Sequence, residues 1–331
     1  MENCKNCFQS IPDLRSAIFC NTCKKPLHRE CAINDGGTFC DVCYTIKEEQ
    51  IIVPEIILPS IMRRSYIELY KTCHFKFYHE VLKNNPQPPS IYAQLGIDLH
   101  TLFDKASQDR TYSKGQMIVD FNMFWLNYKP ELFPSEELRP KMHQRGLTCI
   151  ETFYEVTLPT LNVKPFATEE TIQYSVGEEL PLVQTTSDRV DLVDGMLEMS
   201  DWKTGKVMVG QKISSDLQAP LYIYGVRDKY KIPVRKFTFH YLDENKTRIF
   251  NQINNDEYVC TVGKRDYCIS ISDAISEVKS LFSHIQQGDF NVPRNAKNMI
   301  FQCKYCHIKE QGLCEGSDVE SWRQYNGKGG W

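Results

Sequence analysis

Residues 187–206 read SDRVDLVDGMLEMSDWKTGK, and the pair Asp194-Gly195 inside this stretch predicts a tight β-hairpin. Both residues tolerate the positive φ angles that a two-residue hairpin turn requires. Counting outward from this turn, Asp188 faces Asp201 at the open end of the hairpin. Lys203 lies two residues beyond Asp201, so its side chain points to the same face of the strand.

This face of the hairpin combines apolar residues near the turn with charged residues at the open end. Facing side chains have Cβ atoms about 4.5–5.5 Å apart, and like charges at that distance are destabilising. A divalent cation would remove the repulsion by using both carboxylates as oxygen ligands. Lys203 could then orient a water nucleophile and stabilise charge on the reacting phosphorus. The residues alone leave a second interpretation open, an exposed polar hairpin end with a salt bridge.

The hairpin resembles motifs II and III of the PD-(D/E)XK nuclease superfamily, in its RecB-like branch, which read G-x-x-D-R-x-D and D-x-K-T-G. Asp188, Asp201 and Lys203 occupy the matching positions, while Thr185 stands at the glycine of the first motif. The resemblance implies an α/β, restriction-endonuclease-like core, with a mixed central sheet flanked by helices. It also implies phosphodiester hydrolysis that depends on Mg²⁺ or Mn²⁺.

Three further positions extend this resemblance. Gln218 and Tyr222 match the family's Q-x-x-x-Y motif, which contacts DNA and supports the active site. His100, in the sequence GIDLH, matches a G-x-x-x-H helix whose histidine is a metal ligand. Gln173 stands where the family often has an upstream glutamate. Without the resemblance, the Gln218–Tyr222 pair is an ordinary i,i+4 pair of an amphipathic helix.

Four cysteines far apart in the sequence form a second set. The set resembles that of the iron–sulfur nucleases of the same branch, the AddB carboxy-terminal nuclease and the CRISPR-associated RecB-like exonucleases. That resemblance implies a [4Fe–4S] cluster that fastens the end of the chain to the start of the domain. Four thiolates suit Zn²⁺ equally well, so the spacing leaves the metal open. The four residues are Cys73, Cys303, Cys306 and Cys314.

The amino-terminal segment has a denser pattern of possible ligands. Eight soft ligands in four pairs predict two tetrahedral Zn²⁺ sites, which would supply most of the folding free energy of so small a module. The order resembles RING and PHD cross-brace fingers, especially the prokaryotic RING type. It implies one zinc held by Cys4, Cys7, His28 and Cys31, and another held by Cys20, Cys23, Cys40 and Cys43.

Composition limits the remaining possibilities. The 331 residues carry a net charge of −3, so nucleic-acid binding requires a local cationic groove. The sequence has no GxxxxGK[ST] loop, no secretory signal and no apolar stretch long enough to span a bilayer, so we expect a cytoplasmic protein. Candidate contacts to a nucleic-acid backbone are Lys206, Lys212, Lys229 and Arg235.

The expected organisation is a finger over residues 1–46, a linker over 47–59, a nuclease domain over 60–320 and a flexible tail over 321–331. The nuclease domain would contain a helical insertion at about 105–165. Apolar periodicity predicts helices over 60–82, 91–106, 142–156, 216–228 and 272–288, with more helix up to about 128. Strands are expected within 160–204 and over 234–242.

These features favour a metal-dependent deoxyribonuclease, with an exonuclease acting on single-stranded DNA or DNA ends as the form that the resemblance implies. The finger would serve as a docking module, with a helicase or another protein as its partner. An alternative is an adaptor or ubiquitin-ligase-like protein, in which the finger does the work and the nuclease fold is degenerate.

Overall fold

The computed structural model describes residues 56–290, 303 and 306–314, together with 2–3, 10–11, 17–21, 24–28, 31–34 and 38–39. It divides the chain into two compact units, Met1–Ile56 and Ile57–Trp331. Within the described residues, no helix combines the length and the apolar character needed to cross a membrane.

The amino-terminal unit contains three short antiparallel strand pairs, β1 (Glu2–Asn3) with β2 (Ser10–Ile11), β3 (Ile18–Phe19) with β4 (Pro26–Leu27), and β5 (Ile33–Asn34) with β6 (Thr38–Phe39). Cys20 is fully buried, and the backbone N–H of Cys31 donates to the carbonyl of His28 at 3.0 Å. The other predicted zinc ligands lie outside the described residues; they are Cys4, Cys7, Cys23, Cys40 and Cys43.

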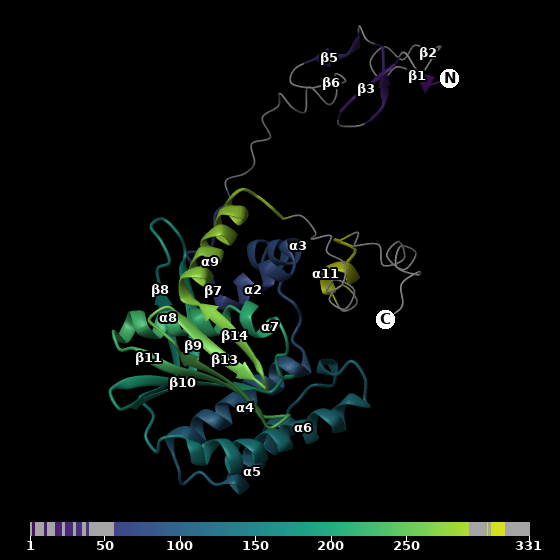
Figure 1. Cartoon of the computed structure of the whole chain (residues 1–331). Helices are drawn as coiled ribbons and strands as arrows, with labels where there is room; N and C mark the ends of the chain where they lie inside the picture. The colour runs from purple at the N-terminus through teal and green to yellow at the C-terminus, as the bar shows by residue number, and fades with distance from the viewer. Residues whose placement is uncertain are drawn as a thin grey trace. The chain divides into compact units, whose positions relative to one another are not determined.

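The second unit is built on one mixed sheet with the strand order β14-β13-β12-β11-β10-β9-β7, and β8 also pairs with β9 (Figure 1). The pairs β10–β11 and β7–β9 are parallel and the others are antiparallel. This arrangement confirms the predicted α/β class with a mixed central sheet. The strands are β7 (Ile61–Arg63), β8 (Ala167–Tyr174), β9 (Leu182–Val193), β10 (Met196–Lys203), β11 (Val234–Tyr241), β12 (Lys246–Gln252), β13 (Glu257–Val262) and β14 (Arg265–Ser270).

The predicted hairpin is formed by β9 and β10. Asp194 and Gly195 have φ angles of 52° and 76°, which is the left-handed backbone that the turn requires. Val193 pairs with Met196, and the ladder continues in the same register to Arg189 and Ser200. The predicted register is therefore confirmed over the printed ladder, which ends one residue before Asp188 and Asp201.

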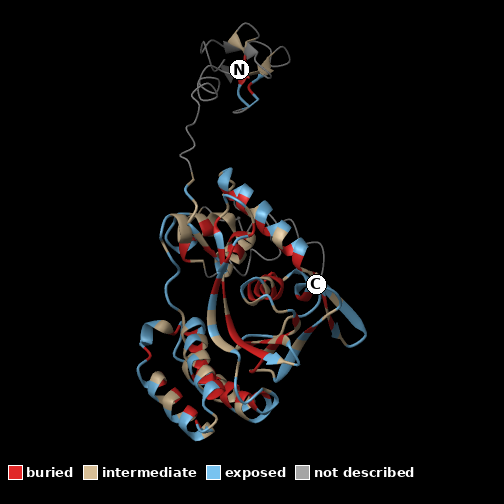
Figure 2. Cartoon of the chain, turned by 90° about the vertical axis from the view of Figure 1, so that its left-hand side faces the viewer, coloured by how far each residue is buried: buried red, intermediate tan, exposed pale blue. Residues whose placement is uncertain are grey.

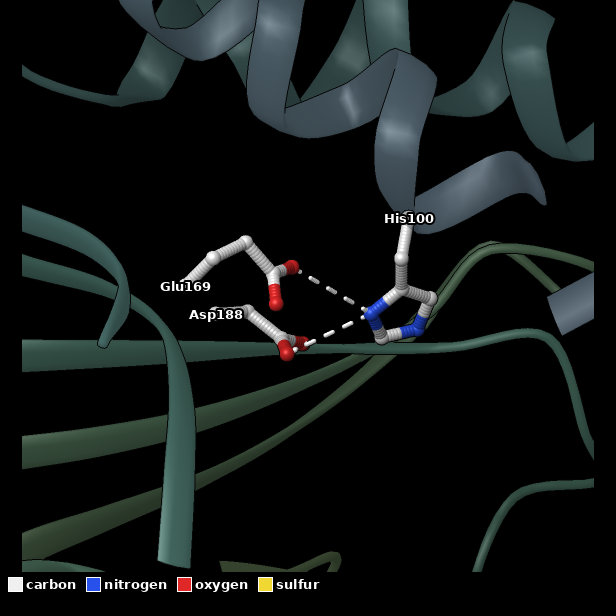
Figure 3. Close-up of side chains that lie close together, drawn as sticks. All are labelled: His100, Glu169 and Asp188. Carbon is white, nitrogen blue, oxygen red and sulfur yellow. Dashed lines mark ion pairs between the residues drawn. The ribbon is translucent and has the colours of Figure 1, made fainter. Parts of the chain in front are cut away.

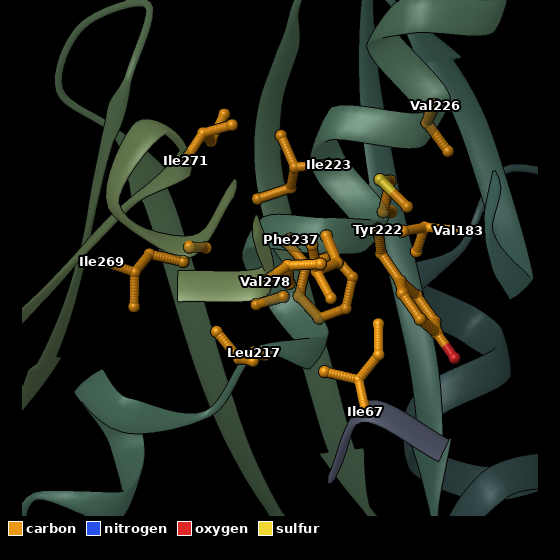
Figure 4. Close-up of a cluster of buried hydrophobic side chains, with 14 of the residues drawn as sticks. Ile67, Val183, Leu217, Tyr222, Ile223, Val226, Phe237, Ile269, Ile271 and Val278 are labelled. Carbon is orange, nitrogen blue, oxygen red and sulfur yellow. The ribbon is translucent and has the colours of Figure 1, made fainter. Parts of the chain in front are cut away.

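One core joins the sheet to α2 (Arg64–Thr72), α8 (Gln218–Tyr230) and α9 (Ile271–Gln286). Ile67 of α2, Ile223 of α8, Phe237 of β11 and Val278 of α9 are all buried in it (Figure 4). Buried residues run along the strands, whereas the covering helices carry exposed residues on their outer sides (Figure 2). Three shorter helices complete this part, α3 (His74–Phe77), α7 (Lys212–Ser215) and α11 (His307–Glu310).

A second core is formed by α4 (Ile91–Gln108), α5 (Lys114–Leu126) and α6 (Leu138–Thr152), which lie together in Figure 1. Trp202 of β10 belongs to this core, although its neighbours along the strand do not. Because successive strand side chains point to opposite faces, Trp202 projects away from the face that carries Asp201 and Lys203. One tripeptide therefore serves both the helical layer and the charged site.

The segment over residues 60–82 differs from the continuous helix that its periodicity predicts. Residues 61–63 form β7 instead, because this segment pairs in parallel with the start of β9. The helix that follows is interrupted at Cys73, whose extended backbone has φ −158° and ψ 108°. Tyr78–Leu82 then form a π-helical turn. The periodicity of the segment is real, but pairing with the sheet overrides it at one end.

We expect Gly225→Ala to lower the free energy of unfolding by about 1–3 kcal/mol, because overpacking a filled core forces its neighbours to move. A Cβ at Gly225 would lie 2.5 Å from a ring carbon of Tyr174. That ring is buried and held by its hydroxyl, which donates to the carbonyl of Leu221 at 2.8 Å.

Urea denaturation of the purified variants measures this effect. Gly115→Ala in α5 is the matched control, because its Cβ would meet nothing closer than 3.9 Å. We expect it to match or slightly exceed the stability of the original chain. Equal stability of the Gly225→Ala and Gly115→Ala proteins would contradict the packing described for α8.

Candidate active site

Asp188 lies on β9 just beyond the hairpin ladder, and its carboxylate is almost fully buried. Its Oδ2 atom accepts a hydrogen bond from the backbone N–H of Trp202 at 2.5 Å. Its Oδ1 atom lies 3.3 Å from Nδ1 of His100 on α4. At the end of the hairpin ladder, one carboxylate oxygen of Asp188 thus accepts the backbone N–H of Trp202. The other oxygen lies near His100 of the helical layer.

Asp201 lies on β10 and is buried, and both of its oxygens meet polar groups from nearby elements. The side-chain amide of Gln218, at the start of α8, donates to Oδ1 of Asp201 at 2.6 Å. The ammonium group of Lys203 lies 2.7 Å from Oδ2 of Asp201 and donates to Oε1 of Gln218 at 2.7 Å. Gln218 therefore holds the carboxylate and the ammonium group in one closed arrangement.

The buried position of Asp201 is electrostatically unfavourable for an ionised carboxylate. Burial raises the pKa of its carboxyl group to about 6, with the nearby Asp188 carboxylate adding to the rise and Lys203 opposing it. Lost hydration and a like charge therefore disfavour the ionised carboxylate, while the ammonium group of Lys203 and the imidazole of His100 favour it. A further positive charge at this place would lower its pKa.

Figure 3 shows a third carboxylate beside Asp188, that of Glu169 on β8. Oε1 of Glu169 lies 3.8 Å from Nδ1 of His100. One ligand atom each from His100, Glu169 and Asp188 lie within 4.8 Å of one another, which makes them a candidate metal-binding group.

The register of β8 and β9 explains why Glu169 lies there. Thr168 pairs with Arg189 and Glu170 pairs with Ser187, so Glu169 stands opposite Asp188. Its φ angle is +45°, a value that non-glycine residues adopt at an energetic cost. Glu169, Asp188 and Asp201 thus follow one another across three neighbouring strands.

Gln173 does not take the place of the family's upstream glutamate, so that prediction is wrong. It lies on β8 opposite Gln184, and the two side-chain amides are hydrogen-bonded at 3.0 Å on an exposed part of the sheet. Glu169 is the acidic residue that the sequence reading missed. Only the pairing register of β8 with β9 places Glu169 at the site. The sequence does not reveal that register, because a loop separates β8 from β9.

His100 is held between two carboxylates. Burial lowers the pKa of its imidazole, but the Asp188 carboxylate and the hydrogen bonds to Asp188 and Glu169 outweigh this and raise the pKa to about 10. The imidazole of His100 is therefore protonated at neutral pH. The imidazolium supplies the positive charge that the two carboxylates require.

Tyr222 lies one helical turn beyond Gln218 and belongs to the core that joins the sheet to α8, where its ring packs edge-on against Phe237 at 6.2 Å. Burial raises the pKa of its hydroxyl well above the ordinary value, and the Asp201 carboxylate raises it further. Tyr222 therefore remains a neutral neighbour of the site. The predicted pair of Gln218 and Tyr222 does lie beside the charged residues.

The site opens into a hollow of about 790 Å³ between α2, α4, β8 and β10. Its lining includes His100, Glu169 and Lys203 from the site and Arg64 from the first turn of α2. Of the four predicted contacts to a nucleic-acid backbone, Lys229 is ion-paired with Glu170, and Arg235 is ion-paired with Glu198 and Asp194.

The second predicted metal site is also partly brought together. Cys73 separates α2 from α3, and its sulfur accepts a hydrogen bond from the backbone N–H of Lys76 at 3.4 Å. Burial raises the pKa of the Cys73 thiol, hydrogen bonds from Lys76 and Phe75 lower it, and Cys303 and Cys306 lie close enough to raise it further.

The carboxy-terminal helix α11 lies against the segment that follows Cys73. His307 is buried, with Nε2 at 3.2 Å from the carbonyl of Asn85 and Nδ1 at 3.6 Å from a carboxylate oxygen of Glu80. Gln311 accepts a hydrogen bond from the Asn85 side chain at 2.8 Å. Cys306 is the N-cap residue of this helix and Cys314 follows it, so two of the predicted cysteines flank α11.

The comparison with known families agrees with this geometry. The family model described as the PD-(D/E)XK nuclease superfamily matches residues 64–311. This range includes all five predicted catalytic residues as well as His100 and Glu169. No protein among those with curated descriptions matches the chain. Because the match covers most of the chain, which has the mixed sheet described above, the protein belongs to the PD-(D/E)XK nuclease superfamily.

Proposed function

We propose that this protein is a deoxyribonuclease of the RecB-like branch, which hydrolyses phosphodiester bonds with Mg²⁺ or Mn²⁺ and acts as an exonuclease on single-stranded DNA or DNA ends. The observation that carries the proposal is the row of three carboxylates on neighbouring strands, with Lys203 at 2.7 Å from Asp201. An exposed polar hairpin end would not bury Asp188 and Asp201.

The residues present fit a divalent cation. Carboxylate oxygens and an imidazole nitrogen are suitable ligands for Mn²⁺, and carboxylates suit Mg²⁺. We assign His100, Asp188 and Asp201 as ligands and add Glu169, whose ligand atom lies within 4.8 Å of those of His100 and Asp188. A bound cation would lower the pKa of an attacking water and offset the charge of the phosphate.

The chain's own residues would complete the chemistry. Lys203 would orient the water and stabilise negative charge on the reacting phosphate, since its ammonium group faces the carboxylates. Gln218 would fix the positions of Lys203 and Asp201 through its two hydrogen bonds. Tyr222 would support Gln218 from the core side of α8. Asp188, Asp201, Lys203, Gln218 and Tyr222 are the proposed catalytic set.

Two further metal centres are part of the proposal. Cys73, Cys303, Cys306 and Cys314 would hold a structural [4Fe–4S] cluster, with Zn²⁺ as the alternative. The closeness of Cys303 and Cys306 to Cys73 supports this site. The amino-terminal cysteines and His28 would hold two Zn²⁺ in a RING- or PHD-like finger, which would dock a helicase or another protein.

Lys203→Ala is expected to reduce metal-dependent cleavage by about a hundredfold to a thousandfold, the usual effect of removing one group that stabilises charge in a transition state. The measurement is the rate at which end-labelled DNA is cut by full-length protein in Mg²⁺ or Mn²⁺. Lys264→Ala, in the exposed turn between β13 and β14, should cut at the original rate.

Cleavage that survives Lys203→Ala would remove Lys203 from the mechanism. A folded, metal-loaded wild-type protein that cuts no DNA would instead favour the adaptor alternative, in which the finger is the working part.

Metal binding should release about one proton at neutral pH, because the imidazole of His100, whose pKa is raised to about 10, must lose its proton to become a ligand. Affinity for Mn²⁺ should therefore rise about tenfold per pH unit between about pH 7 and 9. Below about pH 6 the dependence should steepen, because Asp201 also becomes protonated.

Titration calorimetry in two buffers of different ionisation enthalpy measures the released proton. His100→Gln should bind Mn²⁺ more weakly and release none. An affinity that is the same at pH 7 and pH 9 would show that His100 is not a protonated ligand.

Anaerobically purified protein should be coloured and contain iron and acid-labile sulfide in equal amounts, together with two Zn²⁺ per chain. Cys73→Ser should abolish the visible absorption band, because a cluster that loses one of its four thiolates is no longer held. Cys268→Ser is the matched control, since Cys268 lies exposed on β14 outside the set.

A colourless wild-type protein with additional zinc would replace the cluster by its zinc alternative. A coloured Cys73→Ser protein would exclude Cys73 as a ligand.

A further inference from the structure

Tyr92, in the first turn of α4, lines two hollows at once. One is the hollow of about 790 Å³ that contains His100 and Lys203. The other, of about 380 Å³, lies along α6 and includes Lys141 and Gln144. Tyr92 is therefore the wall that the two hollows share.

The ring of Tyr92 is available for contact with a ligand. The side chain is 53% exposed. In residues 56–290, which the structure describes without a gap, no hydrogen bond, ion pair or ring contact involves it. The exposed ring therefore lies beside the charged site with its faces open to a ligand.

The surface between Tyr92 and His100 is low. These residues and Gly96 are four apart along α4, so all three lie on one helix face, and about 12 Å separates the first from the last. A glycine inside a helix costs about 1 kcal/mol relative to alanine. No crowding in the protein demands it, since a Cβ at Gly96 would meet nothing closer than the Thr204 hydroxyl at 3.8 Å. An absent side chain there leaves room for a ligand backbone.

Cationic side chains lie at both ends of this face, beside carboxylates at its His100 end. Arg64 and Lys203 line the first hollow, and Lys141 lines the second. Lys141 is exposed and forms no ion pair within residues 56–290. Arg145 differs, because it is paired with Asp243 at 3.2 Å and donates to the carbonyl of Thr204. Of the two α6 cations that line this hollow, Lys141 is thus the one without an ion pair among the described residues.

We infer that the face of α4 from His100 to Tyr92 binds a single nucleic-acid strand, with one unpaired base stacked on Tyr92 and the next phosphates passing over Lys141. This inference rests on the proposed nuclease function and assigns its substrate path. Bases inside a duplex are already stacked on both faces, so an exposed aromatic ring stacks on an unpaired base more readily than on a base within a duplex. The strand would run from the carboxylates across Gly96 to the α6 hollow.

Binding is measured with full-length protein carrying Asp201→Asn, so that cleavage does not consume the probe, and a labelled single-stranded oligonucleotide of mixed sequence. Tyr92→Ala should weaken this binding about tenfold, while Tyr92→Phe should stay within about twofold, because the ring and not the hydroxyl stacks. Lys141→Ala should lower the slope of log affinity against log salt by about one phosphate contact. Leu126→Ala, exposed on α5 outside both hollows, should change nothing.

Single abasic substitutions along the oligonucleotide locate the stacked base. At one position the abasic probe should bind about tenfold more weakly to the parent protein, with no further loss in Tyr92→Ala. Losses that add at every position, or Tyr92→Ala binding like the parent, would overturn the inference. Cleavage is compared in proteins that keep Asp201. If the wild-type protein cuts single strands and the Tyr92→Ala protein cuts them equally fast, this inference is wrong and the proposed function still holds. A wild-type protein that cuts no DNA would instead sink the proposed function.

Discussion

Repulsion among three carboxylates on neighbouring strands is the constraint around which the site is built. Asp188 and Asp201 are buried, and Glu169 stands opposite Asp188. The surrounding contacts answer this charge one by one, with an imidazolium from His100, an ammonium from Lys203 and donors from the backbone and from Gln218. The raised pKa of Asp201 shows that the compensation is incomplete. Burying these carboxylates lowers the stability of the fold, and it leaves negative charge in a position where a divalent cation can bind.

Strand alternation explains how two cores can support one site. Asp201 and Lys203 point toward α8, while Trp202 between them is buried among the helices α4–α6. The helical layer is tied to the same strand end a second time, because Arg145 of α6 donates to the carbonyl of Thr204. Movement of α4–α6 would therefore displace the backbone that carries Asp201 and Lys203. The layer that supplies His100 is fixed by the strand that supplies Asp201.

The hairpin could be predicted from sequence because a two-residue turn fixes its register, and β9 and β10 follow that register. Glu169 could not be, since β8 and β9 are joined by residues 175–181 and a loop of that length leaves the register open. The nearest residue by motif spacing, Gln173, lies in the exposed part of the same strand pair. The predicted helix start at residue 60 was wrong for a related reason. Residues 61–63 pair in parallel with β9, and this pairing joins segments more than a hundred residues apart. Local patterns specify local pairing, and the sheet supplies the rest.

Asp289 and helix α11, from late in the sequence, contact α2 and the segment that follows it. Helix α2 begins at Arg64, which lines the hollow of the candidate active site, and ends beside Cys73 about 13 Å away. The Tyr70 hydroxyl donates to the carbonyl of Asp289 at 2.8 Å, and α11 lies against the turn after Cys73. Since α2 is short, its position depends on these attachments as much as on its own hydrogen bonds. A metal centre at Cys73 would fix the far end of the helix that presents Arg64. Its part would then be structural, since it would position Arg64 at the hollow without any transfer of electrons.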